Sequence, residues 1–422
     1  MKQGDIVLLF ADLAVIILVA QLAGRAARAL GQPAVLGEIV AGILMGPTLF
    51  GGAVAATLFP TEARPYLSAL ANVGLVLFMF VVGLEFHYER LRGFGRVTCN
   101  TALSASLLPF ALGSALALYL LGSHPTDNRL GFVLFFGVAM SITAFPVLAR
   151  ILVDHRMDKT LVGAIALSAA AVCDLAGWSM LALVQAMVGG RSTGHWLVLL
   201  IVPFTAVLAF IVRPLLKRLL TREGAGRALT TTRFSVVLAC LFASAAVTEL
   251  IGLHFVFGAF LFGLIMPRKA TERARTDLLE RARTGTSFLL PVYFVVAGLN
   301  VDLSTMGFTG LLELGLILVT AIVGKMTGTF VTARTEGMST RRSTVLATLM
   351  NTRGLTELIV LGIGLRIGML DGSLYAQMVV MAVVTTASTG ILLRWLVGRD
   401  DRNPPETAGP ALREGEVADA RS

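Results

Sequence analysis

The stretch Ala170-Ala171-Val172-Cys173-Asp174-Leu175-Ala176-Gly177-Trp178 places a carboxylate inside a long apolar run. From Thr160 to Val188 there is no Lys, Arg or His and no other carboxylate. Such a run is long enough to cross a bilayer as a helix, which takes about 20 residues. A charge near the middle of a span costs about 3 kcal/mol on insertion scales. We therefore predict that Asp174 has a functional role and is more than a structural partner of a neighbouring helix.

The whole chain is too apolar for a soluble protein of its size. Of its 422 residues, 56% are hydrophobic and 14% are charged, and the mean hydropathy is +0.81. This composition predicts an all-α polytopic membrane protein in contact with the lipid bilayer. The net charge of +9 is attributed to loops on one side of the membrane and not to nucleic-acid binding. The three cysteines have no metal-ligand spacing, and neither a cofactor nor an enzymatic activity is expected.

Apolar windows predict about thirteen spans, with edges uncertain by several residues. They are 6–24, 33–50, 67–86, 99–121, 130–151, 160–188, 195–212, 234–250, 252–267, 286–303, 309–333, 343–365 and 373–396. The basic loops 217–233 and 268–283 are expected to be either surface helices on anionic lipid or solvated loops. The segment 399–422 is polar and contains Pro404 and Pro405, so a disordered tail is predicted.

The distribution of basic residues predicts the orientation of the chain. Most of the 35 Lys and Arg residues fall in loops on one side, and only Lys2, Arg64, Arg129, Arg191 and Arg366 fall in loops on the other. The side rich in basic residues is predicted to be cytoplasmic. In the inner (plasma) membrane of a cell the N-terminus is then outside and the C-terminus inside, which requires an odd number of spans.

The fifth span carries a proline and two hydroxyls, in Ser141-Ile142-Thr143-Ala144-Phe145-Pro146-Val147. A proline inside a helix frees backbone carbonyls that need another partner. The residues alone leave two outcomes open, a broken helix and an ordinary proline kink, and they favour the kink.

Two later spans also carry charged residues. Lys325 in the eleventh span is either functional or a long side chain that reaches the interface. Arg353 and Glu357 in the twelfth are four residues apart, and a structural ion pair and a direct role are both open. The run Asn351 to Gly354 permits local unwinding. Two interrupted helices, one in each half of the chain, indicate a transporter built from inverted repeats with its site at the membrane midplane.

Several further polar residues lie in or at the ends of spans. They are expected to be interfacial, or hydrogen-bonded between helices, and not to touch a transported ion. These residues are Asp12, Gln21, Glu38, Glu85, His87 and Glu249.

A series of motifs along the chain is similar to those of the monovalent cation/proton antiporter superfamily. It resembles most the second branch, which contains bacterial Kef-type proteins and plant cation/proton exchangers. The motifs are Gly31-Gln32-Pro33, Gly42 to Pro47, Leu75 to Glu85, Ser141 to Pro146, Ala169 to Trp178, Phe257 to Phe260, Leu290 to Leu299, Gly324-Lys325 and Asn351 to Leu358. No single motif is diagnostic, but their number and order are specific.

The resemblance implies a transmembrane domain over 1–398 with two parts. A core would take helices at about 99–188 and 309–396, and a dimerisation or scaffold part would take those at about 6–86 and 195–303, so a homodimer is expected. Two broken helices would cross beside the ion site, at Thr143 to Pro146 and Asn351 to Gly354.

The resemblance also implies roles for individual residues. Asp174 matches the acid that binds the ion, Na⁺ or K⁺. Cys173 stands where the family has Asp or Asn, and it is also a candidate for ion binding or proton coupling. Lys325 matches the core lysine, and either it pairs with Asp174 when no ion is bound or it is neutral. The pair is favoured, because a buried charged lysine needs a counter-charge. Arg353 and Glu357 would compensate charge, and Ser141 and Thr143 would add oxygen ligands.

The function expected is exchange of a monovalent cation for a proton by alternating access. Proton and cation would compete for Asp174, and one titrating acid predicts electroneutral exchange. The first alternative is a partner-gated K⁺ efflux channel, although no G-x-G-x-x-G segment of an attached nucleotide-sensing domain follows the spans. A transport-silent membrane sensor is the second alternative.

Overall fold

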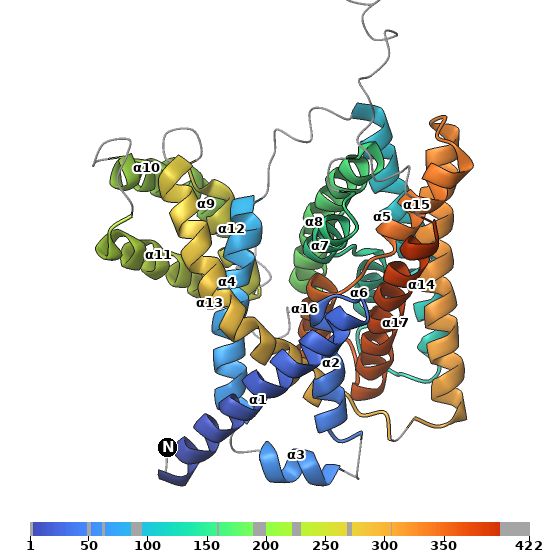
Figure 1. Ribbon diagram of the computed structural model, residues 1–422, viewed down its shortest axis with the longest axis horizontal. Coiled ribbons are helices and arrows are strands. Elements are labelled where there is room, and N and C mark those ends of the chain that lie inside the picture. Colours follow the sequence, from blue (N-terminus) through green and yellow to red (C-terminus); the bar gives the residue numbers. More distant parts are fainter. Residues whose placement is uncertain are drawn as a thin grey trace, which may run out of the picture.

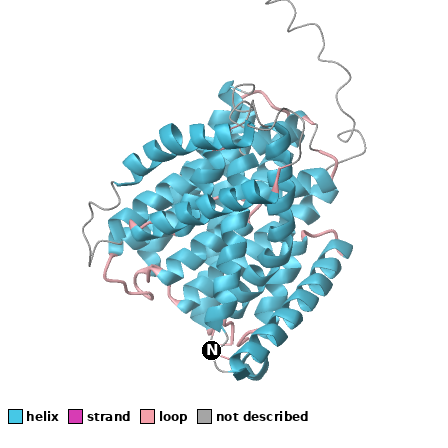
Figure 2. Ribbon diagram, turned by 90° about the vertical axis from the view of Figure 1, so that its left-hand side faces the viewer, coloured by secondary structure: helices cyan, strands magenta, loops and turns pink. Residues whose placement is uncertain are grey.

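The computed structural model describes residues 3–48, 52–60, 64–85, 95–157, 160–188, 200–221, 229–267, 272–304 and 306–396. All secondary structure in these segments is helical, which confirms the predicted all-α class (Figure 2). The predicted tail 399–422 lies outside the described residues, as does His87.

Nine stretches of the described residues are long and apolar enough to cross a membrane. Eight of them lie in the single helices α1 (Gln3–Ala29), α4 (Arg64–Glu85), α5 (Gly95–Leu120), α8 (Leu161–Val188), α11 (Thr231–Leu250), α13 (Glu272–Leu299), α14 (Phe308–Thr335) and α17 (Gly372–Leu396). The ninth, Arg129–Val153, contains two helices, α6 (Arg129–Ser141) and α7 (Phe145–Asp154).

Shorter helices complete the described chain. They are α2 (Ala34–Met45), α3 (Ala53–Leu58), α9 (Ile201–Val207), the π-helical turn η4 (Leu208–Val212), α10 (Arg213–Thr221), α12 (Phe255–Ile265), α15 (Thr340–Met350) and α16 (Leu355–Arg366). The predicted span 195–212 is therefore described only from residue 200 onward, and it continues as one helical run into α10.

The separate surface helix or loop expected over 268–283 is wrong from Glu272 onward. These residues form the first half of α13, which runs without interruption into the span. The segment is rich in Arg, Glu, Leu and Ala, which favour helix. Arg281 also contacts Asp277 one turn earlier at 3.1 Å, a spacing that stabilises a helix surface.

The helices form two groups, and extensive helix–helix contacts occur only within each group. We call α1, α2, α4 and α9–α13 with η4 the first group, and α5–α8 with α14–α17 the second group. Figure 1 shows most of the first group on the left and most of the second on the right. Glycines permit close packing inside the first group, since a Cβ on Gly42 would lie 2.9 Å from the Cα of Gly298 on α13.

The second group contains two triplets of the same design. A long helix, α5 or α14, is followed by a pair of short consecutive helices and then by a long helix, α8 or α17. The helices α5 and α14 pack against each other. They run in opposite directions, with α5 descending from the upper face in Figure 1 and α14 rising from the lower face, where the N-terminus also lies.

Candidate ion-binding site

The first helix break separates α6 from α7. The helix α6 ends at Ser141, the chain is non-helical through Ile142–Ala144, and α7 begins at Phe145. The favoured proline kink is therefore wrong, and the alternative of a broken helix is correct. Pro146 occupies the first turn of α7, where a backbone N–H would have no intrahelical acceptor and the fixed φ of proline suits a helix start.

The second break separates α15 from α16. Residues Asn351–Gly354 are non-helical, as their polar, glycine-containing sequence permits. Gly354 has φ +147°, a conformation that other residues rarely adopt, and a Cβ there would lie 2.9 Å from Cγ2 of Val147 on α7. The N–H of Ala144 donates a hydrogen bond to the carbonyl of Thr352 at 3.2 Å. The two breaks are thus in direct contact.

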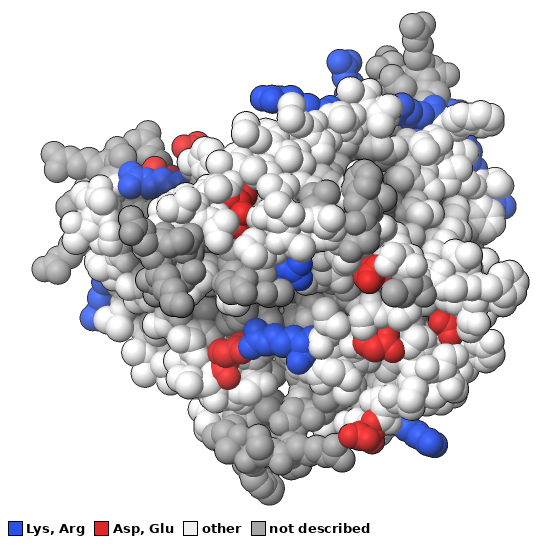
Figure 3. Space-filling model, turned by 90° about the horizontal axis from the view of Figure 1, so that it is seen from below, with Lys and Arg blue, Asp and Glu red and all other residues white. Residues whose placement is uncertain are grey.

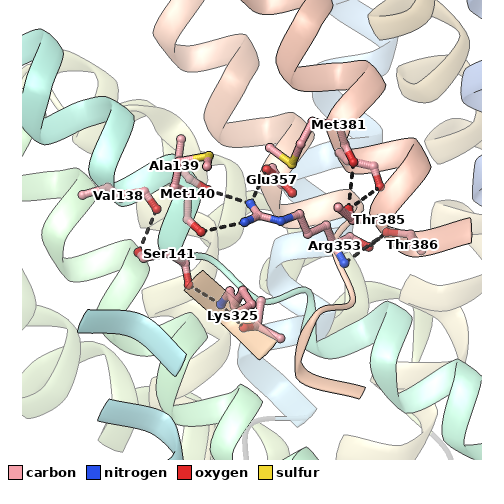
Figure 4. Close-up of polar contacts among 12 residues, drawn as sticks. Val138, Ala139, Met140, Ser141, Lys325, Arg353, Glu357, Met381, Thr385 and Thr386 are labelled. Atoms are coloured by element: carbon pink, nitrogen blue, oxygen red, sulfur yellow. Dashed lines mark hydrogen bonds and ion pairs between the residues drawn. The ribbon is translucent and has the colours of Figure 1, made fainter. Parts of the chain in front are cut away.

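Two buried cations lie at the carbonyl end of α6 (Figure 4). Lys325 Nζ, from α14, donates to the carbonyl of Ser141 and to Oγ1 of Thr143, each at 2.5 Å. Arg353 donates to the carbonyls of Ala139 at 3.2 Å and Met140 at 2.7 Å. The last carbonyls of a helix have no intrahelical donor and carry partial negative charge, so this end of α6 attracts positive groups.

Arg353 is also fixed from its own side. Its guanidinium donates to Glu357 at 2.6 Å, and both side chains are fully buried, which confirms the pair suggested by the spacing of four. Thr386 on α17 accepts from the N–H of Arg353 at 3.1 Å and donates to its carbonyl at 2.7 Å. The second break therefore contains its own neutral pair, held by a neighbouring helix.

Asp174 lies on α8, 5% exposed, and neither of its carboxylate oxygens has a hydrogen-bond partner among the described residues. Its charge interacts with that of Lys325 and with the backbone of Phe145, at the start of α7. The predicted direct pair between Lys325 and Asp174 is wrong, because the ammonium group bonds to Ser141 and Thr143 instead. A buried carboxylate without donors is unstable as a bare anion and is satisfied by a proton or a cation.

The remaining predicted ligands already have partners. Cys173 accepts a hydrogen bond from Ser106 Oγ at 3.3 Å and donates to the carbonyl of Ala102 at 3.5 Å, so its thiol faces α5. Ser141 Oγ donates to the carbonyl of Val138 at 2.8 Å within its own helix. Ser106 and Ala102 were not predicted, because no local pattern on α5 marks them as neighbours of α8.

A cavity of about 540 Å³ opens between the two groups of helices. It lies toward the upper side of the molecule in Figure 1, the side on which α5 begins. Helices α1, α2, α4 and α13 of the first group form its walls, and Pro146, Val147 and Arg150 of α7 line it from the second group. Val147 lines this cavity and also lies against Gly354, so the cavity approaches the second break to within one side chain.

Contacts between the groups close the lower side below Asp174. Trp178, one turn further along α8, packs edge-on against Phe257 of α12, with ring centroids 5.7 Å apart. Arg366 at the end of α16 forms an ion pair with Glu249 at the end of α11. Figure 3 shows this lower face, on which acidic and basic side chains are scattered over a mostly uncharged surface. The cavity therefore approaches the crossing from the upper side, while these two contacts join the groups on the lower side.

One polar cluster on the lower side was missed from the sequence. His124, between α5 and α6, contacts Asp371 through Nδ1 at 2.5 Å and Glu313 through Nε2 at 3.1 Å. Burial lowers the pKa of His124, but the hydrogen bonds and charges of Asp371 and Glu313 outweigh it and raise the pKa above its usual value. Glu313, a carboxylate in the predicted span 309–333, was the signal available.

Comparison with known proteins shows the family. A family model described as "Sodium/hydrogen exchanger, transmembrane" matches residues 14–399. The Na(+)/H(+) antiporter NhaS4 of Synechocystis sp. is 36% identical over 403 residues, which cover 93% of this chain and 98% of that protein.

Eukaryotic relatives are longer. Cation/H(+) antiporter 17 of Arabidopsis thaliana is 38% identical over 390 residues, which cover 90% of this chain and 47% of that protein. K(+)/H(+) antiporter 1 of Saccharomyces cerevisiae is 32% identical, with 85% of this chain and 42% of that protein covered. The chain thus spans about half the length of these two relatives.

The fold is also found among solved structures. The sodium proton antiporter MjNhaP1 of Methanocaldococcus jannaschii superposes with a TM-score of 0.68 over 93% of this chain and 99% of that chain, at 14% sequence identity. At this identity the match supports the fold alone. From the family model, the relatives and the arrangement of its helices, the chain belongs to the sodium/hydrogen exchanger family of membrane antiporters.

Proposed function

We propose that this chain exchanges Na⁺ or K⁺ for protons, with Asp174 as the group that both ions share. Family membership makes the chain a cation/proton antiporter. The observation that carries the assignment to Asp174 is a carboxylate that is only 5% exposed and has no hydrogen-bond partner among the described residues, near Lys325 and the backbone of Phe145 at the first break. A proton or a monovalent cation satisfies such a group, and the binding of one excludes the other.

The surrounding residues then have distinct roles. Lys325 supplies a basic group near Asp174 and stabilises the first break through Ser141 and Thr143. Arg353 and Glu357 form a neutral pair that stabilises the second break. Cys173 is a neutral thiol bonded to α5, which leaves Asp174 as the single acid at this position of α8. One acid that carries either one proton or one monovalent cation predicts electroneutral exchange.

The second group of helices is the candidate core, and the first group is the candidate scaffold and dimer-forming part. The two triplets, with opposed directions of α5 and α14, support an inverted repeat. Movement of the second group against the first would close the upper cavity and open the lower side, which gives alternating access. By the distribution of basic residues the upper side is cytoplasmic in the plasma membrane.

The experiment is proton flux in proteoliposomes with a pH-sensitive dye inside, started by Na⁺ or K⁺. Cation-dependent flux is expected in the natural protein and is expected to vanish in Asp174→Asn, which keeps the shape of the side chain but cannot ionise. Glu85→Gln is the matched control, since Glu85 is a carboxylate on α4 of the first group, where it pairs with Arg283. Its flux should persist.

Two outcomes would contradict the proposal. Flux that persists in Asp174→Asn would remove Asp174 from the mechanism. Cation movement without any counter-movement of protons would indicate a pore and would contradict exchange.

A further inference from the structure

The upper cavity contains an uneven set of charges. Three arginines and two glutamates line it, namely Arg28, Arg150, Arg283, Glu38 and Glu85. A cation that moves from the upper side toward Asp174 passes through this cavity. The guanidinium groups of the three arginines repel such a cation. The carboxylates of the two glutamates attract a cation and so oppose this repulsion.

The two glutamates differ in their partners. Glu85, near the end of α4, forms an ion pair with Arg283 of α13. Glu38, on α2, is half-buried and has no hydrogen bond or ion pair with the residues that the structure describes. Arg28 is the charged group that acts on it, without direct contact. Glu38 therefore has no directly contacting ion-pair partner among the described residues, whereas Glu85 has one.

Glu38 also lies on the wall that faces the site. It belongs to the first group, while Pro146 and Val147 of the second group line the same cavity next to the two breaks. A Cβ on Gly24 of α1 would lie 3.5 Å from Oε1 of Glu38, so the carboxylate lies along the boundary between α1 and α2. A cation that reaches Asp174 through the cavity comes under the influence of this carboxylate first.

We propose that Glu38 attracts the transported cation into the upper cavity before it reaches Asp174, and that Arg28 limits the strength of this attraction. The inference rests on the proposed function. A charged group in a cleft with apolar walls acts over a longer distance than on an open surface, because the walls focus its field. Removal of the Glu38 carboxylate would leave less negative charge to balance the positive charge of the arginines in the cavity. The local concentration of cations in the cavity would then fall.

The test is the cation concentration that gives half-maximal exchange, measured in proteoliposomes whose transporters face one way, with the cation added on the upper side. For Glu38→Gln we expect this concentration to rise by about tenfold with the maximal rate retained, as for loss of electrostatic steering. Glu38→Asp should restore it, and Arg28→Gln should lower it. A high concentration of an impermeant salt should shrink these differences by screening.

A charge-neutral double variant, Glu85→Gln with Arg283→Gln, is the matched control. It alters the same cavity but leaves its net charge unchanged, so the half-maximal concentration should stay within about twofold of the natural value. When the cation is added on the lower side, Glu38→Gln should leave the half-maximal concentration unchanged. A structural defect would instead lower the maximal rate from both sides.

The inference is overturned if Glu38→Gln leaves the half-maximal concentration unchanged, or if it lowers only the maximal rate. Either result, together with an inactive Asp174→Asn, would leave the proposed function intact. Persistent exchange in Asp174→Asn would instead contradict the proposed function itself, whatever Glu38→Gln does.

Discussion

The two helix breaks perform the same geometric task with different chemistry. The first, Ile142–Ala144, has no charge of its own, and a lysine from another helix satisfies its carbonyl end. The second, Asn351–Gly354, contains Arg353, which pairs with Glu357 four residues later. The second break thus carries its own ion pair, whereas the carbonyl end of the first is satisfied by two cations from outside it, Lys325 of α14 and Arg353 of the second break.

The difference indicates which break takes part in ion exchange. Lys325 reaches both the first break and the electrostatic environment of Asp174, so a change in the charge of Asp174 is felt by Lys325 and the first break. The pair of Arg353 and Glu357 is enclosed, with Thr386 bonded to both backbone groups of Arg353. We infer that the second break is a rigid support and that the first is the responsive one.

Removal of one partner of the Arg353–Glu357 ion pair should lower the stability of the protein more than any other change considered. Glu357→Leu leaves the buried guanidinium of Arg353 without its counter-charge, and removing one partner of a buried pair costs about 3–5 kcal/mol. The measurement is the free energy of unfolding in detergent. The double variant Arg353→Met with Glu357→Leu should recover a large part of the loss, and a double variant as unstable as the single one would contradict this account.

Loss of the lysine at the first break should destabilise the protein less. Lys325→Met removes two hydrogen bonds from a charged donor, and bonds of this kind contribute about 1.5–3 kcal/mol each. Much of this loss is offset, because Lys325→Met also removes a buried ammonium group, whose transfer out of water costs several kcal/mol, and leaves no directly contacting carboxylate without its partner. Exchange should nevertheless be lost, and a variant with full exchange would show that the first break does not respond to Lys325.

Gly354→Ala tests the tight conformation of the second break. The φ of +147° and the approach to Val147 both oppose a side chain, and strain of this type costs about 1–3 kcal/mol. Val147→Ala should relieve the contact but not the backbone strain, so the double variant should recover only in part. At the first break Ala144→Gly, where the backbone is extended, should be tolerated, and equal losses at both positions would refute the contrast.

The smallest effect is expected far from both breaks, at His124. Its pKa is raised by Asp371 and Glu313, so the stability it adds is fully present below the unfolded pKa of about 6.5 and is lost as pH rises through the folded pKa. The thermal stability of the natural protein relative to His124→Gln should therefore be greatest in acid. A difference in thermal stability between the two proteins that grows toward alkaline pH would contradict a raised pKa of His124.

The apolar periods and glycine and proline positions predicted the helical class, the second break and the placement of Asp174, because each depends on local sequence. The partner of Lys325 could not be predicted, since it depends on how α14 approaches the carbonyl end of α6. The proline at 146 suggested a kink because the sequence does not show that neighbouring side chains satisfy the freed carbonyls of α6. The pairing of His124 with residues 189 and 247 positions away was equally inaccessible.

The central claim is that one carboxylate binds either a proton or a cation. It is tested most directly by calorimetric titration of the purified protein with Na⁺ or K⁺ in buffers of different ionisation enthalpy, which gives the number of protons released for each cation bound. The account predicts about one proton released per cation under conditions where the acid is protonated, and none in Asp174→Asn. Cation binding with no proton release, or proton release that persists in Asp174→Asn, would contradict it.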